Sequence, residues 1–411
     1  MLVFVYERKE MSYRDITEKE IRVPYSGLGS LVGQEDVDAV KEALAQGNLC
    51  SGYYVKKFED AFADYVGAKH AISCSNCTTA LELVTAGLGL KSGDEVITTP
   101  LTFIATSLPL LKRKVRVVFA DIDPLTFNLD PDSVARMVTS RTKAIYVVHY
   151  AGLSADMDRI MAIAKEYDLK VIEDAAHASG SSYKGKMVGG IGDATCFSFQ
   201  SLKNMTTLGD GGMITTNDEY LASKIRRLKT FGILHLLDRT TKYGQREKNP
   251  PYYWDVKDFD GEVGLNYRMS EPEAAVGLVQ LKKLNMMNSR RIQIATKINE
   301  ALKDIPGLQV PYEPEQCKHV YHLYTLLVNE DVIGSKDDFM QKLDVDYGID
   351  TWLQYCPNYL FTIYRNMGYK PGICPVAEDI FMKHLVNLPI YPSLTDEQVD
   401  YMIDAIRTIV A

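Results

Sequence analysis

Short apolar runs rich in β-branched residues alternate with longer segments of helical spacing between about residues 30 and 230. The short runs predict strands, and the longer segments, such as 79–88, 132–138 and 156–167, predict helices. Seven strands are expected, at residues 70–74, 95–99, 116–119, 144–148, 170–173, 195–199 and 213–216. This alternation predicts an α/β fold, in which a mostly parallel seven-stranded sheet carries helices on both faces. Side chains with a chemical role should then gather at the strand ends and in the loops beyond them.

The later part of the chain has a different pattern. Residues 235–265 combine Arg and Lys with Tyr, Trp and two adjacent Pro residues, which indicates a long irregular excursion. Later elements are expected as a long helix at 271–302, a strand near 323–328 and helices near 336–347 and 395–409. We therefore expect an N-terminal segment (1–28), a large domain (29–267) and a smaller C-terminal α/β domain (268–411).

Composition and charge exclude several classes of protein. The net charge of −8 over 411 residues comes from interspersed acidic and basic residues, which argues against a nucleic-acid or membrane surface. No apolar stretch approaches the roughly 20 residues that span a bilayer. The apolar run at 2–6 is too short for a signal peptide and has no basic segment before it. These features predict a cytoplasmic protein.

The seven cysteines predict no metal centre. Only Cys74 and Cys77 have a CxxC spacing, and the second pair that a structural zinc site usually needs is missing. The pair is therefore either a redox pair or two small residues in a tight turn.

Four segments carry candidate chemistry, and the first is a turn that follows a predicted strand and opens a helix. Residues 73–80 read SCSNCTTA. Small polar residues at a helix start cap its free N–H groups, which is the plain interpretation. The same unpaired N–H groups and the helix dipole also favour a bound phosphate.

The second segment, residues 171–178, reads VIEDAAHA. An apolar strand here delivers Asp174, two small residues and His177 at its C-terminal end. A carboxylate in this position can hold a protonated heteroaromatic nitrogen, and small neighbours let a flat ring approach closely. The alternative is a helix cap with a satisfied histidine.

The third segment, residues 196–204, reads CFSFQSLKN and is followed by GDGG at 209–212. A lysine that leaves a buried strand can lie inside a site, where loss of water lowers its pKa and suits Schiff-base chemistry. A solvated lysine is the alternative, since Lys is rarely buried. The fourth segment, NYRMSE at 266–271, could be a capping box with Ser270 or Asn266 as the cap.

Taken in this order, the four segments resemble one family, the DegT/DnrJ/EryC1/StrS sugar aminotransferases of fold-type I, which use pyridoxal 5′-phosphate (PLP). The resemblance extends from about Gly29 to the C-terminus. Further matches are GDEVI (93–97), TFIAT (102–106), GDA (192–194), GYK (368–370), PVA (375–377) and LP followed by YP (388–392). Each motif is common alone, and their combination in this order is specific.

The resemblance implies a role for each matching residue. Lys203 would be the Schiff-base lysine that moves protons once released, and Asp174 would pair with the pyridinium nitrogen. The remaining cofactor contacts would be Phe103 and Ala176 on the two ring faces, His177 beside them, Thr78, Thr79 and Ser198 at the phosphate, and Asn266 and Arg268 at the partner's phosphate. The family therefore implies a homodimer with shared active sites.

The implied reaction moves an amino group from Glu or Gln to a keto-sugar linked to a nucleotide. Arg239, Lys242, Tyr243, Arg246 and Trp254 of the excursion could contact an anionic nucleotide or donor carboxylate, or form a solvated loop at a dimer rim.

The chain departs from the family pattern at four places: at Cys77, at Gln200, at Asp210 and in the segment 354–359, which lacks a histidine. Transamination of a cyclitol ketone, dehydration of a sugar and a non-catalytic PLP-binding regulator stay open as alternatives. Relatives that dehydrate sugars carry His at the position of Lys203, so the lysine favours amino transfer.

Overall fold

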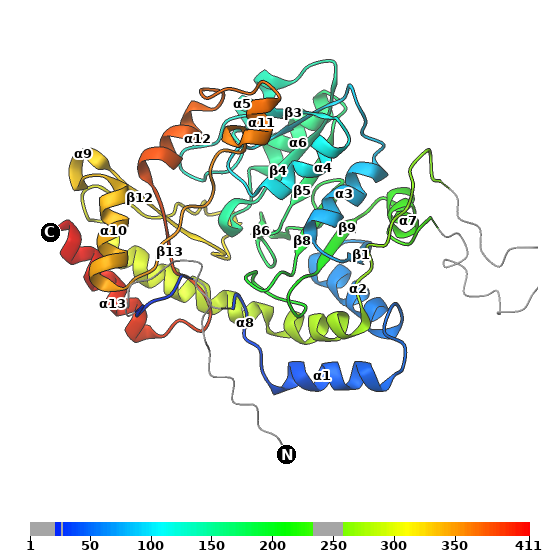
Figure 1. Ribbon diagram of the computed structural model, residues 1–411, viewed down its shortest axis with the longest axis horizontal. Helices are drawn as coiled ribbons and strands as arrows, with labels where there is room; N and C mark the ends of the chain where they lie inside the picture. Colours follow the sequence, from blue (N-terminus) through cyan, green and yellow to red (C-terminus); the bar gives the residue numbers. More distant parts are fainter. Residues whose placement is uncertain (1–20, 26–27, 233–257) are drawn as a thin grey trace, which may run out of the picture.

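A seven-stranded sheet forms the centre of the molecule in the computed structural model, which describes residues 21–25, 28–232 and 258–411 (Figure 1). Its order is β1-β9-β8-β5-β4-β2-β3. The strands are β1 His70–Cys74, β2 Glu95–Thr98, β3 Arg116–Phe119, β4 Thr142–Val148, β5 Lys170–Asp174, β8 Ala194–Ser198 and β9 Gly212–Thr216. Neighbouring strands are parallel except where β9 pairs with β8 and β1. The prediction of a mostly parallel seven-stranded sheet is confirmed.

Helices cover both faces of this sheet because alternate strand residues point to opposite sides. In β5, Ile172 packs with α3 and α7, whereas Val171 packs with α5 and α6 on the other face. The covering helices are α2 Tyr53–Val66, α3 Cys77–Gly87, α4 Leu108–Lys112, α5 Pro131–Met137, α6 Met157–Glu166 and α7 Glu219–Leu228. The three helices expected in this region from apolar spacing correspond to α3, α5 and α6.

A second core lies at the C-terminal end of the chain. It contains a three-stranded antiparallel sheet in the order β10-β12-β13, packed against α10, α13 and the second half of α8. Its elements are α8 Glu271–Leu302, β10 Leu308–Gln309, β12 Tyr324–Val328, α10 Lys336–Tyr347, β13 Leu385–Leu388 and α13 Asp396–Val410. All four later elements expected from the sequence are therefore present.

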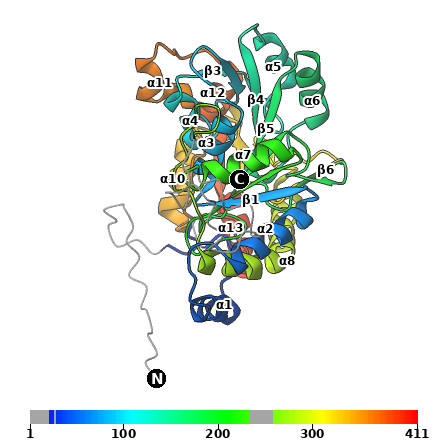
Figure 2. The same ribbon diagram turned by 90° about the vertical axis from the view of Figure 1, so that its right-hand side faces the viewer.

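Helix α8 connects the two cores. Its first half packs against α1 (Gln34–Ala45) and α2, and its second half against α13 (Figures 1 and 2). Ser270 is its N-cap: the hydroxyl accepts from the N–H of Glu273, whose carboxylate accepts from the N–H of Ser270 at 2.6 Å. The expected domain boundary near residue 268 falls just before this shared helix and stays a prediction.

The remaining elements are short connections and edges. They are η1 Ile104–Thr106, η2 Tyr150–Gly152, β6 Ser182–Tyr183, β7 Lys186–Met187, β11 Cys317–Lys318, α9 Glu330–Ile333, η4 Asn358–Leu360, α11 Thr362–Asn366, α12 Pro375–Asp379 and η5 Ile380–His384. Most of the expected excursion, with its basic and aromatic side chains at 239–254, lies outside the described residues.

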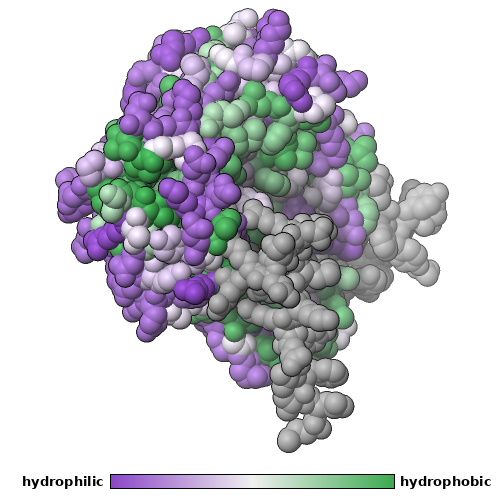
Figure 3. Space-filling model, turned by 60° about the vertical axis from the view of Figure 1, so that its left-hand side comes forward, coloured by the Kyte–Doolittle hydropathy of each residue, from purple (hydrophilic) through white to green (hydrophobic). Residues whose placement is uncertain are grey.

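The described surface carries mixed polarity. Hydrophilic side chains cover much of the face drawn in Figure 3, and apolar ones gather in patches between them. No helix in the described part of the chain is long and apolar enough to cross a membrane.

Candidate active site

Four loops meet at the C-terminal edge of the sheet, which is where functional groups gather in parallel α/β folds. They follow β1, β2, β5 and β8, and they carry the turn at Asn76, the segment of Phe103, the strand end at Asp174 and the lysine at 203. Direct contacts join three of them. Thr106 donates a hydrogen bond to Asp174, and the Cys77 thiol lies 4.0 Å from the same carboxylate.

Asp174 is a buried carboxylate, 5% exposed. Among the described residues, no cationic side chain forms a direct ion pair with it. Its Oδ2 accepts from the Thr106 hydroxyl at 2.8 Å, and its Oδ1 accepts from the N–H of Ala176 at 3.1 Å. Burial raises its pKa, which these two hydrogen bonds and the charge of Lys203 oppose. A buried carboxylate in this state would be stabilised by a cationic N–H group placed against it.

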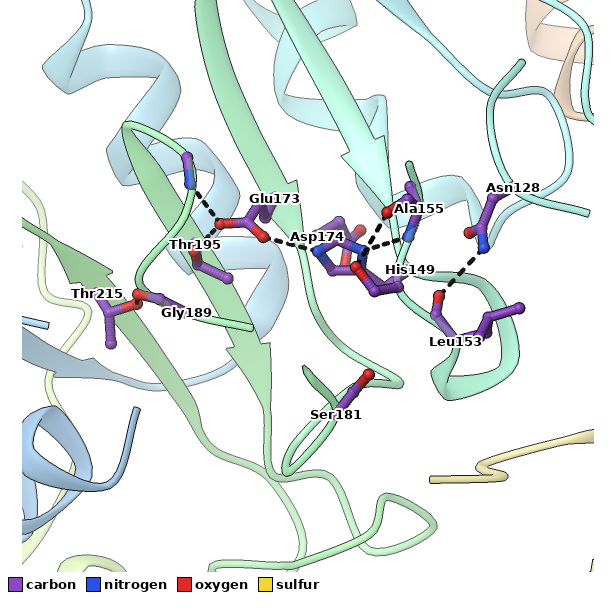
Figure 4. A network of polar contacts seen from close by, with 12 residues as sticks. Asn128, His149, Leu153, Ala155, Glu173, Asp174, Ser181, Gly189, Thr195 and Thr215 are labelled. Atoms are coloured by element: carbon purple, nitrogen blue, oxygen red, sulfur yellow. Dashed lines mark hydrogen bonds and ion pairs between the residues drawn. The ribbon is translucent and has the colours of Figure 1, made fainter. Parts of the chain in front are cut away.

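The neighbouring residue, Glu173, anchors the strand end that presents Asp174 (Figure 4). Its Oε2 lies 2.9 Å from Nε2 of the fully buried His149, and its Oε1 accepts from the N–H of Gly192 and the hydroxyl of Thr195. The N–H of Ala155 donates to Nδ1 of His149, so that ring carries its hydrogen on Nε2 and donates to Glu173. A fully satisfied buried network of this kind holds the end of β5 rigid.

Lys203 lies in a turn after β8, and its N–H donates to the carbonyl oxygen of Gln200 at 2.8 Å. The side-chain oxygen of Gln200 accepts from the N–H of Leu202 at 2.8 Å, which is a turn-holding role. The Lys203 amine lies 3.4 Å from Nε2 of His322. Burial lowers the pKa of Lys203 to about 8, and the charge of Asp174 opposes the shift. Lys203 is half-buried and lines a pocket, which favours a place inside the site over the alternative of a solvated surface lysine.

The segment before α1 crosses the backbone of the turn at residues 200–203, which is called the lysine turn below. Gly29 donates its N–H to the carbonyl oxygen of Ser201 at 3.0 Å, and its own carbonyl accepts from the buried guanidinium of Arg291 at 2.7 Å. A Cβ on Gly29 would lie 2.1 Å from the carbonyl oxygen of Leu202 and 2.3 Å from that of Lys203. The absence of a side chain here is what allows the contact.

The turn that opens α3 retains free N–H groups. Asn76 caps the helix by accepting from the N–H of Thr79, and the Thr79 hydroxyl donates to the carbonyl of Asn76 at 2.8 Å. Both polar groups of Thr79 are thus used within the turn. The N–H groups of Cys77 and Thr78 make no hydrogen bond to another described residue, so they are available to an anion.

The CxxC pair belongs to the same turn and has no sign of redox chemistry. Cys74 and Cys77 are buried free thiols, and burial raises the pKa of Cys74 to about 11. A thiol with a raised pKa is a poor nucleophile, so the pair fits two small residues in a tight turn.

An aromatic cluster closes one side of the site. His177 lies with Nε2 3.1 Å from the Tyr355 hydroxyl and with its ring centroid 4.4 Å from that of His322. Phe103 is 58% exposed, and its ring lies 6.1 Å from Tyr355. Lys203, His322 and Tyr355 line one pocket together with Gln200, Gln354, Tyr25 and Arg291.

The other expected site residues have separate positions. Ser198 is buried at the end of β8, and Ala176 is half-buried directly after Asp174. Asn266 is exposed, and its side-chain oxygen accepts a hydrogen bond from Nε of Arg268 at 2.9 Å. The backbone carbonyl of Tyr267, the residue between them, accepts from the N–H of Ser75. The pair thus lies at the surface beside the turn that opens α3.

The sequence is similar to those of known proteins over most of its length. The sequence profile of the DegT/DnrJ/EryC1/StrS aminotransferase family matches residues 31–407. The chain belongs to this family. Its curated relatives include the spore coat polysaccharide biosynthesis protein SpsC of Bacillus subtilis, 41% identical over 94% of this chain and 97% of that protein. GDP-perosamine synthase of Caulobacter vibrioides is 36% identical over 86% of this chain and 90% of that protein.

Solved structures show the same fold throughout. The aminotransferase from Psychrobacter cryohalolentis has a TM-score of 0.86 at 34% identity and covers 94% of this chain and 98% of its own. The family consists of PLP-dependent aminotransferases of fold-type I, so the expected fold class, enzyme class and cofactor are confirmed. A Streptococcus pneumoniae protein is represented by two structures. Its PLP form has a TM-score of 0.83 at 25% identity and covers 94% of this chain and 98% of its own. Its PMP form has a TM-score of 0.84 at 26% identity and covers 94% of this chain and 99% of its own.

The residues present fit PLP. A pyridinium N–H would give the buried Asp174 carboxylate a cationic partner, the phosphate would meet the free N–H groups of Cys77 and Thr78, and the Lys203 amine has the lowered pKa that attack on an aldehyde requires.

Three residues of this site had no role assigned from the sequence. Thr106 was part of the TFIAT motif without a function, and Tyr355 lies in the segment noted only for its missing histidine. His322 gave no local signal, because its contact with Lys203 spans 119 positions.

Proposed function

We propose that this aminotransferase moves an amino group from Glu or Gln to a keto-sugar linked to a nucleotide, with Lys203 as the residue that moves protons. The observation that carries the proposal is the half-buried Lys203, whose amine faces the pocket beside His322 and whose pKa burial lowers to about 8, with the charge of the buried Asp174 acting on it. An amine in this state can attack a carbonyl and exchange protons near neutral pH, which an ordinary lysine does poorly.

Each residue has a defined role in this scheme. Asp174, held by Thr106 and Ala176, keeps a proton on the pyridine nitrogen. When bound, PLP supplies a ring that accepts the electron pair left as the donor loses its α-proton. Lys203 would take that proton from the donor α-carbon and deliver it to the carbon on the other side of the transferred nitrogen, and water would then release the donor as a 2-oxo acid while the amino group stays on the cofactor. The same residues then work in reverse on the keto-sugar.

The phosphate of PLP would lie at the start of α3. Thr78 can offer both N–H and hydroxyl, whereas both groups of Thr79 are already used in capping the helix. We therefore assign the phosphate contact to Thr78, with Ser198 as a further donor, and assign Thr79 to shaping the turn.

The sugar substrate is proposed from the relatives. SpsC acts in polysaccharide biosynthesis by its name, and GDP-perosamine synthase makes a nucleotide-linked amino sugar by its name. Both are similar to this chain over most of their length. A cyclitol ketone is the alternative amino acceptor, and it presents the same ketone chemistry without the nucleotide.

A homodimer is proposed from the position of Asn266 and Arg268. The pair lies at the surface next to Ser75, and the neighbouring side chains of Val263, Leu265 and Phe231 are exposed by 74%, 44% and 40%. Exposed apolar side chains beside polar ones are typical of a surface that a second copy covers. Arg268 of each subunit would then reach the phosphate of the other subunit's cofactor.

The experiment that tests the reaction supplies ¹⁵N-labelled glutamate or glutamine and a panel of nucleotide-linked 4-keto and 3-keto sugars and one cyclitol ketone. Mass spectrometry of the products identifies the acceptor that gains one labelled amino group. Labelled product from a nucleotide-linked sugar only is the expected result. Labelled product from the cyclitol only, or release of water from a sugar without any label, would contradict the proposal.

A further inference from the structure

A line of three buried side chains connects the main-chain carbonyl of Ser179 to the amine of Lys203. Asn288, on α8, donates from Nδ2 to that carbonyl at 2.9 Å. Asn204 donates from Nδ2 to Oδ1 of Asn288 at 2.8 Å. Nδ1 of His322 lies 3.2 Å from Oδ1 of Asn204, and Nε2 of the same ring lies 3.4 Å from the lysine. The three linking side chains are at most 8% exposed.

The hydrogen bonds of this line have one direction. A carbonyl oxygen only accepts, so Asn288 turns its NH₂ group to the carbonyl and its oxygen to Asn204. Asn204 donates to that oxygen and also to the carbonyl of Val320 at 3.1 Å, which leaves its own oxygen for His322. The ring of His322 therefore carries its hydrogen on Nδ1, and the lone pair of Nε2 faces the amine.

We propose that His322 is a positioning residue for Lys203, accepting one hydrogen of the amine at Nε2 and so fixing the direction in which the amine exchanges protons. The proposal rests on the proposed function of Lys203. An amine on a four-carbon side chain rotates freely, and one anchored hydrogen removes that freedom. Asn204 also gains a role, because its oxygen selects the tautomer of the histidine.

His322 is held as a neutral acceptor. Burial lowers its pKa well below the usual value, and the charges of Lys203, His177 and Arg291 act in the same direction. Its backbone N–H donates to the carbonyl of Ala151 at 2.8 Å, and its ring packs against that of His177, so the ring has little room to turn.

The test compares three variants of the full-length protein. His322→Phe keeps a flat ring without an acceptor, and His322→Gln keeps an acceptor oxygen. His319→Phe is the matched control, because His319 is 3% exposed and stacks on Tyr321 without touching Lys203.

The first measurement is acetylation of Lys203 in the PLP-free protein, followed by mass spectrometry across the pH range. The Lys203 amine is faced by Asp174 and Cys77 as well as by His322. Since the acceptor favours the charged amine, His322→Phe should move the labelling midpoint down by about half a pH unit or more, and His322→Gln by less. The second measurement is kcat for amino transfer, which should fall by about 10- to 100-fold in His322→Phe with the donor KM nearly unchanged.

A labelling midpoint and a kcat in His322→Phe equal to those of His319→Phe would overturn the inference. If the phenylalanine variant does not fold, Asn204→Leu serves instead, because it frees the tautomer and should shift the midpoint in the same direction. The labelling needs no substrate. A shifted midpoint in a protein without amino transfer would therefore contradict the proposed function alone, and an unshifted midpoint in an active aminotransferase would contradict this inference alone.

Discussion

The Thr106 hydroxyl donates a hydrogen bond of 2.8 Å to Oδ2 of Asp174, and this contact links the loop after β2 to the end of β5. A second hydroxyl, that of Thr102, lies 2.8 Å from Thr106 in the buried interior. Burial raises the pKa of Asp174, and the hydrogen bond from Thr106 opposes this rise by favouring the ionised carboxylate, which is the form that keeps a proton on a pyridine nitrogen.

Replacing Thr106 by Val should weaken PLP binding. A hydrogen bond to a charged group contributes about 1.5–3 kcal/mol, so we expect the Kd for PLP to rise by about 10- to 100-fold. Titration of the PLP-free protein, followed by absorbance, measures it. Thr102→Val is the comparison, because the Thr102 hydroxyl contacts Thr106 and not Asp174 and its loss should raise the Kd by less. A Kd in Thr106→Val no higher than in Thr102→Val would show that the direct hydrogen bond has no such role.

Replacing Gly29 by Ala should displace the lysine turn. The added Cβ would lie 2.1 Å from the carbonyl oxygen of Leu202, and overpacking of this kind costs about 1–3 kcal/mol. We expect a lower Tm and weaker PLP binding. In Gly33→Ala, by contrast, the added Cβ meets only the flexible Glu35 side chain. A Gly29 variant that binds PLP as tightly as the Gly33 variant would refute the proposed close contact.

Capture of PLP by the cofactor-free protein should depend on pH. Burial lowers the pKa of Lys203 from its usual value to about 8, and only the neutral amine attacks an aldehyde. The rate of capture should therefore rise with pH through about 8 and level off above it. Stopped-flow absorbance provides the profile. A rate of capture that keeps rising to about pH 10, as for a solvated lysine, would contradict the lowered pKa of Lys203.

Mixed dimers should restore activity that each variant lacks alone. If Arg268 completes the partner's site, a dimer of one Lys203→Ala subunit and one Arg268→Ala subunit has one site with both lesions and one with neither. We expect the mixture to recover a substantial share of the wild-type kcat after subunit exchange. A mixture no more active than the Arg268→Ala variant would mean that each subunit builds its whole site.

The sheet and the residues at its edge could be predicted from the sequence because both leave local signals. Apolar strands followed by Asp174 and Lys203 place those side chains at the C-terminal edge without knowledge of the rest of the fold. The assignment of Thr79 to capping the helix and of Thr78 to the phosphate also involves neighbouring residues only. It depends on which hydrogen bonds form, and two adjacent threonines in a sequence do not show which of them caps the helix.

Contacts between distant segments could not be predicted from such signals. His322 reaches Lys203 only because the segment before β12 folds back onto Ala151, and Gly29 reaches the lysine turn only because Arg291 holds it there. The spacing of these residues along the sequence does not indicate that they are in contact. The contacts to an anionic nucleotide or a donor carboxylate that the sequence suggests at 239–254 lie outside the described residues and stay a prediction.

The most direct test of the account is the first half of the reaction in the wild type and in Lys203→Ala, each loaded with PLP and mixed with glutamate. The wild type should convert its absorbance from about 420 nm to about 330 nm as the PLP form becomes the PMP form, with one equivalent of 2-oxoglutarate released. The variant should bind PLP without this conversion. Conversion of the variant at the wild-type rate, or no conversion of the wild type with either glutamate or glutamine, would contradict the central claim that Lys203 moves the proton in an amino transfer.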